Sequence, residues 1–256
     1  LPSESDIARD IASNVDPDAV FGARQALRHT IAHALFDRLN EYYQALSAPE
    51  PYSPNAPAAG RRALKNVCLD LLTATGEPSA IARAMSQYES ADNMTDRMAA
   101  LQALALCDVP GRRIALDDFY ARYADDPLIV DKWLSLQASI PEPKTLDQVK
   151  ALTNHRAFSM ANPNRVRALI GAFAMSNQTQ CNRADGAGYD FIVDSVLALD
   201  RKNPQLAARL LSALKSWRVL EPTRRALAQA ALRRVAQTAS LSRDVGDIVQ
   251  RALAEN

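Results

Sequence analysis

Two histidines on one helical face are the first residues of this sequence whose spacing could support chemistry. His29 and His33 are the ends of HTIAH, which has the spacing of the zinc motif HExxH and places both imidazoles on one side of a helix. In that motif a glutamate is the general base that activates a metal-bound water, and here its position holds Thr30. We therefore expect an ordinary helix face, with no metal and no catalytic residue in the chain.

Other catalytic signatures are missing from the sequence. It contains no GxSxG elbow, no cysteine–histidine nucleophile context and no glycine-rich phosphate loop. Gly186 and Gly188 follow no predicted strand, so they indicate a turn rather than a nucleotide fingerprint.

A short basic segment is the sharpest candidate for a binding site. Asn162, Asn164, Arg165 and Arg167 surround Pro163, which predicts the start of a helix, where backbone donors and the helix dipole favour anions. Each guanidinium can hold a carboxylate bidentately. The alternative is a capped helix whose arginines form structural ion pairs with nearby Asp or Glu residues, which is the commoner use of such residues.

Arg209 is a second candidate, at the margin of the apolar stripe that contains Leu206 and Leu210. The alternative is a solvated arginine whose stem covers apolar surface.

The composition favours an all-α fold. Glycine is scarce, at 8 of 256 residues, and runs of alternating β-branched residues are nearly absent. The net charge of +1 gives no overall bias toward nucleic acid or membranes, and no apolar run is long enough to span a bilayer. Cys68, Cys107 and Cys181 are widely spaced and odd in number, so we expect reduced thiols and a cytoplasmic protein.

Prolines divide the chain into predicted helices. Asp-Pro, Asn-Pro and Glu-Pro pairs each precede an apolar-periodic run, because proline fits the first helical position and Asp or Asn caps the free donors. The predicted helices span 4–13, 17–46, 59–75, 78–89, 94–107, 110–123, 127–139, 144–152, 163–175, 187–200, 204–217, 222–237 and 243–254.

This organisation predicts one domain over 1–256, a superhelix of stacked antiparallel helix pairs of the armadillo or HEAT type. Two segments interrupt it: a proline-rich loop at 48–60 and a long polar loop at 175–190. Asp131, Trp133 and His155 are expected to be packing corners.

Several separated motifs stand out along the sequence: LPSESDIA at the start, ADNMTD at 91–96, DKWLSLQA at 131–138, HRAFSMANPNRVRALIGAF at 155–173, DGAGYDFIVD at 185–194 and KNPQLAARLL at 202–211. They resemble motifs of the C-terminal domain of the bacterial aminopeptidase N family, zinc enzymes of the gluzincin class. Because they occur in order over nearly the whole sequence, we expect the chain to be a piece of such an enzyme.

The resemblance implies a superhelix that closes over a catalytic domain and encloses a chamber leading to zinc. Zinc and its ligands would belong to that missing domain; in this chain the third-ligand position holds Tyr52. The implied partners are the catalytic domain of the same parent chain and peptide substrates, with Arg167 and then Arg209 facing the channel. The alternative from another class is a stand-alone armadillo-like scaffold whose concave face binds a protein or peptide.

Overall fold

Proline begins seven α-helices in the described residues, at the positions that the sequence predicts. The computed structural model describes residues 1–48 and 50–254. The helices with proline at their first position are α2 (Pro17–Ala34), α5 (Pro78–Ser90), α7 (Pro110–Tyr123), α8 (Pro127–Ala138), α10 (Pro163–Val166), α14 (Pro204–Leu211) and α15 (Pro222–Ala236). The other α-helices are α1 (Glu4–Ile11), α3 (Phe36–Leu46), α4 (Ala56–Ala74), α6 (Met94–Ala105), α9 (Thr145–Leu152), α11 (Ala172–Ser176), α12 (Gln178–Cys181), α13 (Ala187–Asp200) and α16 (Arg243–Leu253).

The all-α prediction is confirmed, since no strand occurs in the described residues. One parallel bridge joins Val15 to Leu220, where the Val15 N–H donates to the Val219 carbonyl (2.8 Å) and the Glu221 N–H donates to the Val15 carbonyl (2.9 Å). No helix within 1–48 and 50–254 is long and apolar enough to cross a membrane. Cys68, Cys107 and Cys181 are all free thiols.

The chain divides into two compact units. Unit 1 contains Leu1–Gly22 and the chain from Asp125 onward, and unit 2 contains Ala23–Ala124, so the division falls inside α2. The expectation of one domain over 1–256 stays a prediction. Pro49, in the predicted loop 48–60, and residues 255–256 lie outside the described residues.

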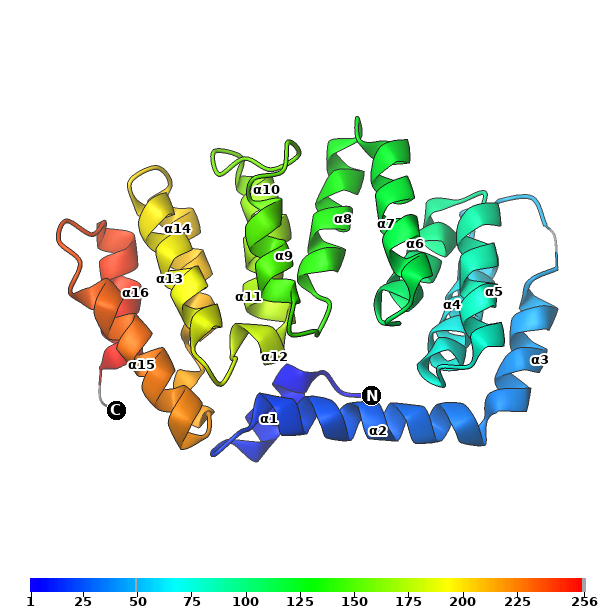
Figure 1. Cartoon of the computed structure of the whole chain (residues 1–256), viewed down its shortest axis with the longest axis horizontal. Helices are drawn as coiled ribbons and strands as arrows, with labels where there is room; N and C mark the ends of the chain where they lie inside the picture. Colours follow the sequence, from blue (N-terminus) through cyan, green and yellow to red (C-terminus); the bar gives the residue numbers. More distant parts are fainter. Residues whose placement is uncertain (49, 255–256) are drawn as a thin grey trace. The chain divides into compact units, whose positions relative to one another are not determined.

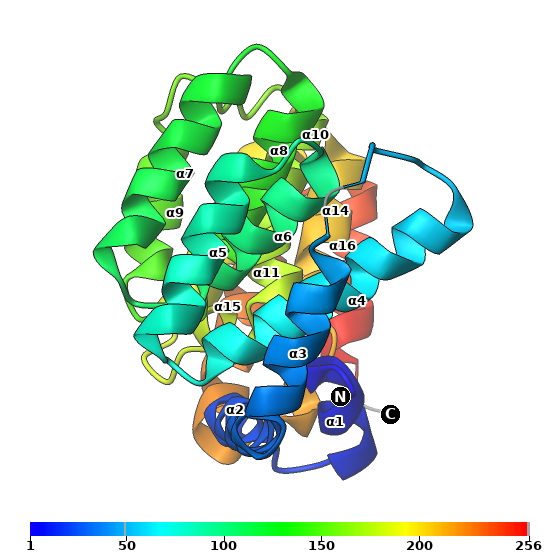
Figure 2. The ribbon, with the colours of Figure 1, turned by 90° about the vertical axis from the view of Figure 1, so that its right-hand side faces the viewer.

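Unit 2 is built from helix pairs. α3 packs on α4, α5 packs on α6, and α4 also packs on α6 (Figure 2). Its core contains fully buried leucines at 69, 72, 101 and 104 together with Phe119. The predicted single helix over 17–46 is interrupted at Leu35, and Figure 2 views α2 almost end-on while α3 runs across the view.

Unit 1 repeats this pairing. α13 packs on α14 and α15, and α16 packs on α14 and α15 (Figure 1, yellow to red). The predicted helix over 204–217 is shorter than expected, because after Leu211 the chain continues as two 3-10 turns, Ser212–Leu214 and Trp217–Val219. The predicted loop over 175–190 contains the short helix α12, whose first turn is capped by the buried Asn177 side chain.

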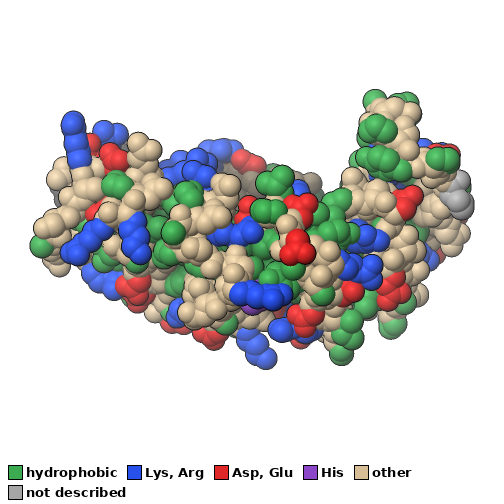
Figure 3. All heavy atoms as spheres, turned by 90° about the horizontal axis from the view of Figure 1, so that it is seen from above, with side chains coloured by type: hydrophobic (Ala, Val, Ile, Leu, Met, Phe, Trp, Pro, Cys, Tyr) green, Lys and Arg blue, Asp and Glu red, His purple; other side chains and the backbone are tan. Residues whose placement is uncertain are grey.

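Basic and acidic side chains are interspersed on the face drawn in Figure 3. This mixture agrees with the net charge of +1. In the same view apolar side chains lie between the charged ones.

Candidate functional site

The predicted basic segment forms the start of α10 in unit 1. Asn162 caps this helix: its Oδ1 accepts hydrogen bonds from the backbone N–H groups of Asn164 (3.0 Å) and Arg165 (3.4 Å). The sequence prediction of an Asn-Pro helix start is therefore confirmed, and the cap satisfies two donors that have no partner within the first turn.

A π-helical turn, Arg167–Gly171, interrupts the helix predicted for 163–175. Its wide hydrogen bond runs from the Ala172 N–H to the Arg167 carbonyl, five residues back. The Ser135 hydroxyl on α8 donates to the Ala168 carbonyl within this turn (2.9 Å), so the turn has a donor from outside its own helix. Such π-turns are rare and occur frequently at functional sites.

Arg165 forms an ion pair within the protein, which is the alternative raised from its sequence context. Its Nη1 donates to the Pro127 carbonyl (2.8 Å) and to the carboxylate of Asp131. The side chains of Arg165 and Asp131 are only 12% and 21% exposed. Since both partners are withdrawn from water, this charge-assisted pair fixes α10 against α8.

Arg167, two residues further along, has different surroundings. It is exposed, and its Nη1 donates to Oδ1 of Asn164 (3.1 Å). No ion pair joins it to any acidic residue in the described part of the chain. Its charge is therefore free to interact with an anion.

Arg167 and Arg209 line one cavity of about 230 Å³. The Arg209 side chain is exposed and has neither a hydrogen bond nor an ion pair within residues 1–48 and 50–254. The cavity lies between α14 and the π-turn with α11, and the residues around the two guanidiniums are Val166, Gly171, Ala172, Met175, Ser176, Leu206 and Leu210.

This lining defines what the cavity can bind. Two cations beside a mainly apolar wall suit an anion that carries an apolar group. Gly171 leaves space there, because a Cβ at this position would meet nothing closer than the Val166 carbonyl at 3.7 Å.

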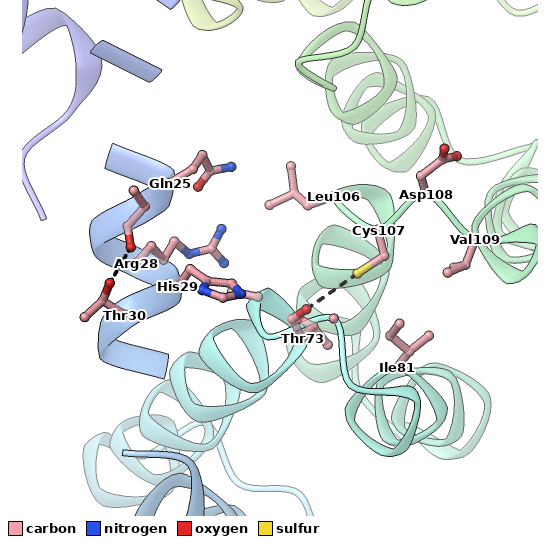
Figure 4. A pocket seen from close by; sticks show the side chains of 13 residues that line it. Gln25, Arg28, His29, Thr30, Thr73, Ile81, Leu106, Cys107, Asp108 and Val109 are labelled. Carbon is pink, nitrogen blue, oxygen red and sulfur yellow. Dashed lines mark hydrogen bonds between the residues drawn. The ribbon is translucent and has the colours of Figure 1, made fainter. Parts of the chain in front are cut away.

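The predicted histidine pair lies in unit 2, where His29 lines a different cavity, of about 720 Å³ (Figure 4). The Nε2 atoms of His29 and His33 are 3.1 Å apart, and the Thr30 hydroxyl donates to the Ala26 carbonyl (2.9 Å). Within the described residues no group of three or more His, Cys, Asp or Glu side chains could hold a metal ion. The residues present therefore do not fit a catalytic zinc.

Figure 4 also shows Cys107 on the opposite wall of that cavity, where its thiol donates to the Thr73 carbonyl (4.0 Å). Burial raises the pKa of this thiol above its usual value. A thiol with a raised pKa is a poor nucleophile, so the cavity has no activated cysteine.

Two of the residues expected at packing corners, Trp133 and His155, lie against each other. Trp133 is buried, and its ring centroid lies 5.4 Å from that of His155. Burial also lowers the pKa of His155, which favours the neutral imidazole.

Ser135, Gly171 and Met175 were not predicted from the sequence as residues of this region. For Ser135 a signal was present, because it follows Asp131 by four residues and hence lies on the same face of α8.

Comparison with known proteins gives one family. Residues 1–254 match the family described as "Domain of unknown function (DUF3458_C) ARM repeats". The chain is similar to Aminopeptidase N of Caulobacter vibrioides, at 38% identity over 253 residues, and to Aminopeptidase N of Escherichia coli, at 35% identity over 254 residues. In both comparisons the match covers 99% of this chain and 29% of the relative.

A solved structure agrees with this. Legionella pneumophila aminopeptidase A, in complex with aspartic acid, matches with a TM-score of 0.89 and 28% identity. The match covers 99% of this chain and 30% of that one. The chain thus spans less than a third of the length of the relatives it matches.

Proposed function

Because this chain belongs to the DUF3458_C family of ARM-repeat domains, we propose that it is the non-catalytic C-terminal domain of a zinc aminopeptidase and covers the enzyme's active-site chamber. The similarity to Aminopeptidase N over 99% of the chain supports this proposal. The domain would control which peptides enter the chamber and would hold the part of the peptide that lies beyond the cleaved bond. Such a domain acts through access and positioning rather than bond-making.

The hydrolytic chemistry would belong to the rest of the parent enzyme, a catalytic domain that is this chain's partner. When bound there, zinc supplies a water of lowered pKa for attack on the peptide bond. The gene that encodes this chain should then contain an HExxH motif and a downstream glutamate before it. A gene without them would favour the stand-alone scaffold.

At the level of residues, the proposal rests on the cavity that Arg167 and Arg209 line. In the parent enzyme both guanidiniums would face the internal channel and attract the C-terminal carboxylate of a short peptide. Asn164 would orient Arg167 through their hydrogen bond (3.1 Å), and Asn162 would hold the start of α10. Arg165, paired with Asp131, would position this helix beside the channel.

The test compares a peptide acid with its C-terminal amide in the full-length enzyme. For Arg167→Ala we expect a higher KM for the acid, equivalent to about 1–3 kcal/mol of lost binding, because a charge-assisted contact is removed. The amide should change much less, since it lacks the carboxylate. Equal losses for both peptides would show that Arg167 has only a structural role.

A further inference from the structure

A second group of arginines surrounds a cleft of about 770 Å³ in unit 2. Its walls come from α3, α4, α5, the segment before α4 and the start of α6, so it is separate from the histidine cavity of Figure 4 and from the Arg167 cavity of unit 1. Its charged lining residues are four cations, Arg61, Arg62, Lys65 and Arg83, and three carboxylates, Glu50, Asp92 and Asp96.

A buried polar network forms the floor of this cleft. The Tyr43 hydroxyl donates to Gln87 (2.9 Å), and the Gln87 amide donates to Asn66 (2.8 Å). Asn66 and Lys65 in turn donate to the two oxygens of Asp96, at 2.9 and 2.6 Å. Asp96 is therefore satisfied within the protein, and its charge is balanced by Lys65.

Arg62 has donors that the protein does not use. Its Nη1 donates to the Ser53 carbonyl (2.9 Å), and its guanidinium lies 4.9 Å from the centroid of the Tyr52 ring, which fixes its plane. Its Nε is buried and has no hydrogen-bond partner among the described residues. Because that atom is shielded from solvent, a ligand in the cleft would meet the Nη atoms of Arg62, of which Nη2 has no hydrogen-bond partner among the described residues.

Arg83 is the second cation without an acidic partner. Its Nη1 donates to the amide oxygen of Asn40, and its guanidinium lies 5.1 Å from the centroid of the Tyr43 ring. Arg61, in contrast, is paired with Glu50 at 2.8 Å. The unpaired positive charge of the cleft is thus concentrated at Arg62 and Arg83.

We propose that this cleft binds the side-chain carboxylate of an acidic residue in an extended peptide segment. A carboxylate can accept hydrogen bonds from a planar guanidinium at two positions, and Arg62 and Arg83 both have guanidinium donors that no carboxylate among the described residues accepts. The cleft has one more cation than carboxylates, so a singly charged ligand balances it better than a dianionic phosphate. Its volume exceeds that of a carboxylate and leaves room for neighbouring residues of the peptide.

The experiment measures binding of two blocked peptides to the 256-residue chain by calorimetry. One peptide is acetyl-Ala-Ala-Glu-Ala-Ala-amide and the other has Gln in place of Glu. Because both ends are blocked, neither peptide carries the C-terminal carboxylate proposed for the Arg167 cavity, so this test fails or succeeds independently of the proposed function. We expect the Glu peptide to bind at least about tenfold more tightly than the Gln peptide.

Charge-removing variants locate the site. Arg62→Gln and, separately, Arg83→Gln should each weaken binding of the Glu peptide by about tenfold. Arg113→Gln, which removes an exposed arginine of α7 outside the cleft, is the matched control, and Arg167→Ala controls for the other cavity. Both variants should bind the Glu peptide with the same affinity as the unsubstituted 256-residue chain. Thermal unfolding followed by circular dichroism identifies any variant that fails to fold, and the other cleft variant then decides.

Three results would overturn the proposal. The first is equal affinity for the Glu and Gln peptides. The second is an equal effect of the cleft variants and of Arg113→Gln. The third is that inorganic phosphate displaces the Glu peptide at concentrations below the peptide's own Kd, which would make the cleft a site for free oxyanions.

Discussion

Two arginine-containing regions of unit 1 use the same side chain in opposite ways. Arg224, at the start of α15, is about 5% exposed and reaches Asp16 (3.2 Å), Asp18 and Glu221 (3.4 Å). Its Nε also donates to the Asn182 carbonyl (2.6 Å). Arg167 and Arg209, by contrast, are exposed and have no acidic partner in the described part of the chain.

The difference shows how the surroundings decide what an arginine does. Around Arg224 the carboxylates come from both ends of the sequence, so the guanidinium joins the N-terminal segment to α15 beside the Val15–Leu220 bridge. Backbone donors of Arg224 and Thr223 and the Arg224 guanidinium also lower the pKa of Glu221. A fully partnered arginine stabilises the fold, whereas an unpartnered arginine beside a cavity is available to a ligand.

The largest expected effect is therefore at Arg224. Arg224→Met keeps most of the side-chain volume but removes the charge that three carboxylates and the Asn182 carbonyl share. We expect it to lower the free energy of unfolding by about 2–4 kcal/mol, measured by urea denaturation, because the Asn182 carbonyl and the Glu221 carboxylate lose a donor. The control is Arg225→Met, an exposed neighbour, which should change stability by less than about 0.5 kcal/mol. Similar losses of unfolding free energy in both variants would show that Arg224 stabilises the fold no more than its exposed neighbour does.

The second-largest expected effect on stability is at Gly188, which lies close to α12, the helix just before Asn182. A Cβ on Gly188 would lie 2.2 Å from the Cys181 carbonyl oxygen and 2.6 Å from that of Gln180. Gly188→Ala must therefore displace α12, which directly precedes Asn182, and should cost about 2–3 kcal/mol.

The matched control for that substitution is Gly246→Ala in α16. At Gly246 a Cβ meets nothing within 4 Å, so alanine should stabilise the helix by about 0.5–1 kcal/mol. Thermal unfolding of the two variants should give shifts in opposite directions. If the Gly188→Ala protein were as stable as the unsubstituted chain, the close approach of Gly188 to α12 would not be needed for stability.

The smallest expected change in stability is at Arg209. Since its side chain has no partner within the described residues, Arg209→Ala should change the free energy of unfolding by less than about 0.5 kcal/mol. In the full-length enzyme we expect it to raise the KM for a peptide acid but not for the amide. A loss of more than about 1 kcal/mol in urea denaturation would place Arg209 with the structural arginines instead.

The sequence predicts the helix starts well, because their causes are local. Pro163 and Pro204 begin helices where expected, and Asn162 and Ser242 cap through hydrogen bonds to donors two or three residues away. The all-α class follows from the same local preferences. These features depend on neighbouring residues along the chain, which the sequence shows directly.

The parts that escape prediction depend on residues distant in sequence. The π-turn at Arg167–Gly171 is contacted by Ser135, and the partner of Arg165 is Asp131, more than thirty residues earlier. Gly188 marks the position as a turn in the sequence, but its role is close packing against α12. From residue types alone Arg165 and Arg167 are equal candidates, and the resemblance singles out Arg167; the packing shows which of the two has an acidic partner.

Arg165 and Arg167 therefore provide the most direct test, since they lie two residues apart. The measurement is the free energy of unfolding of Arg165→Ala and Arg167→Ala in urea under the same conditions. We predict a loss of about 2–3 kcal/mol for Arg165→Ala, because Asp131 is left largely buried without its partner. For Arg167→Ala we predict less than about 0.5 kcal/mol. Equal losses, or a larger loss for Arg167→Ala, would contradict the assignment of one arginine to the fold and the other to a ligand.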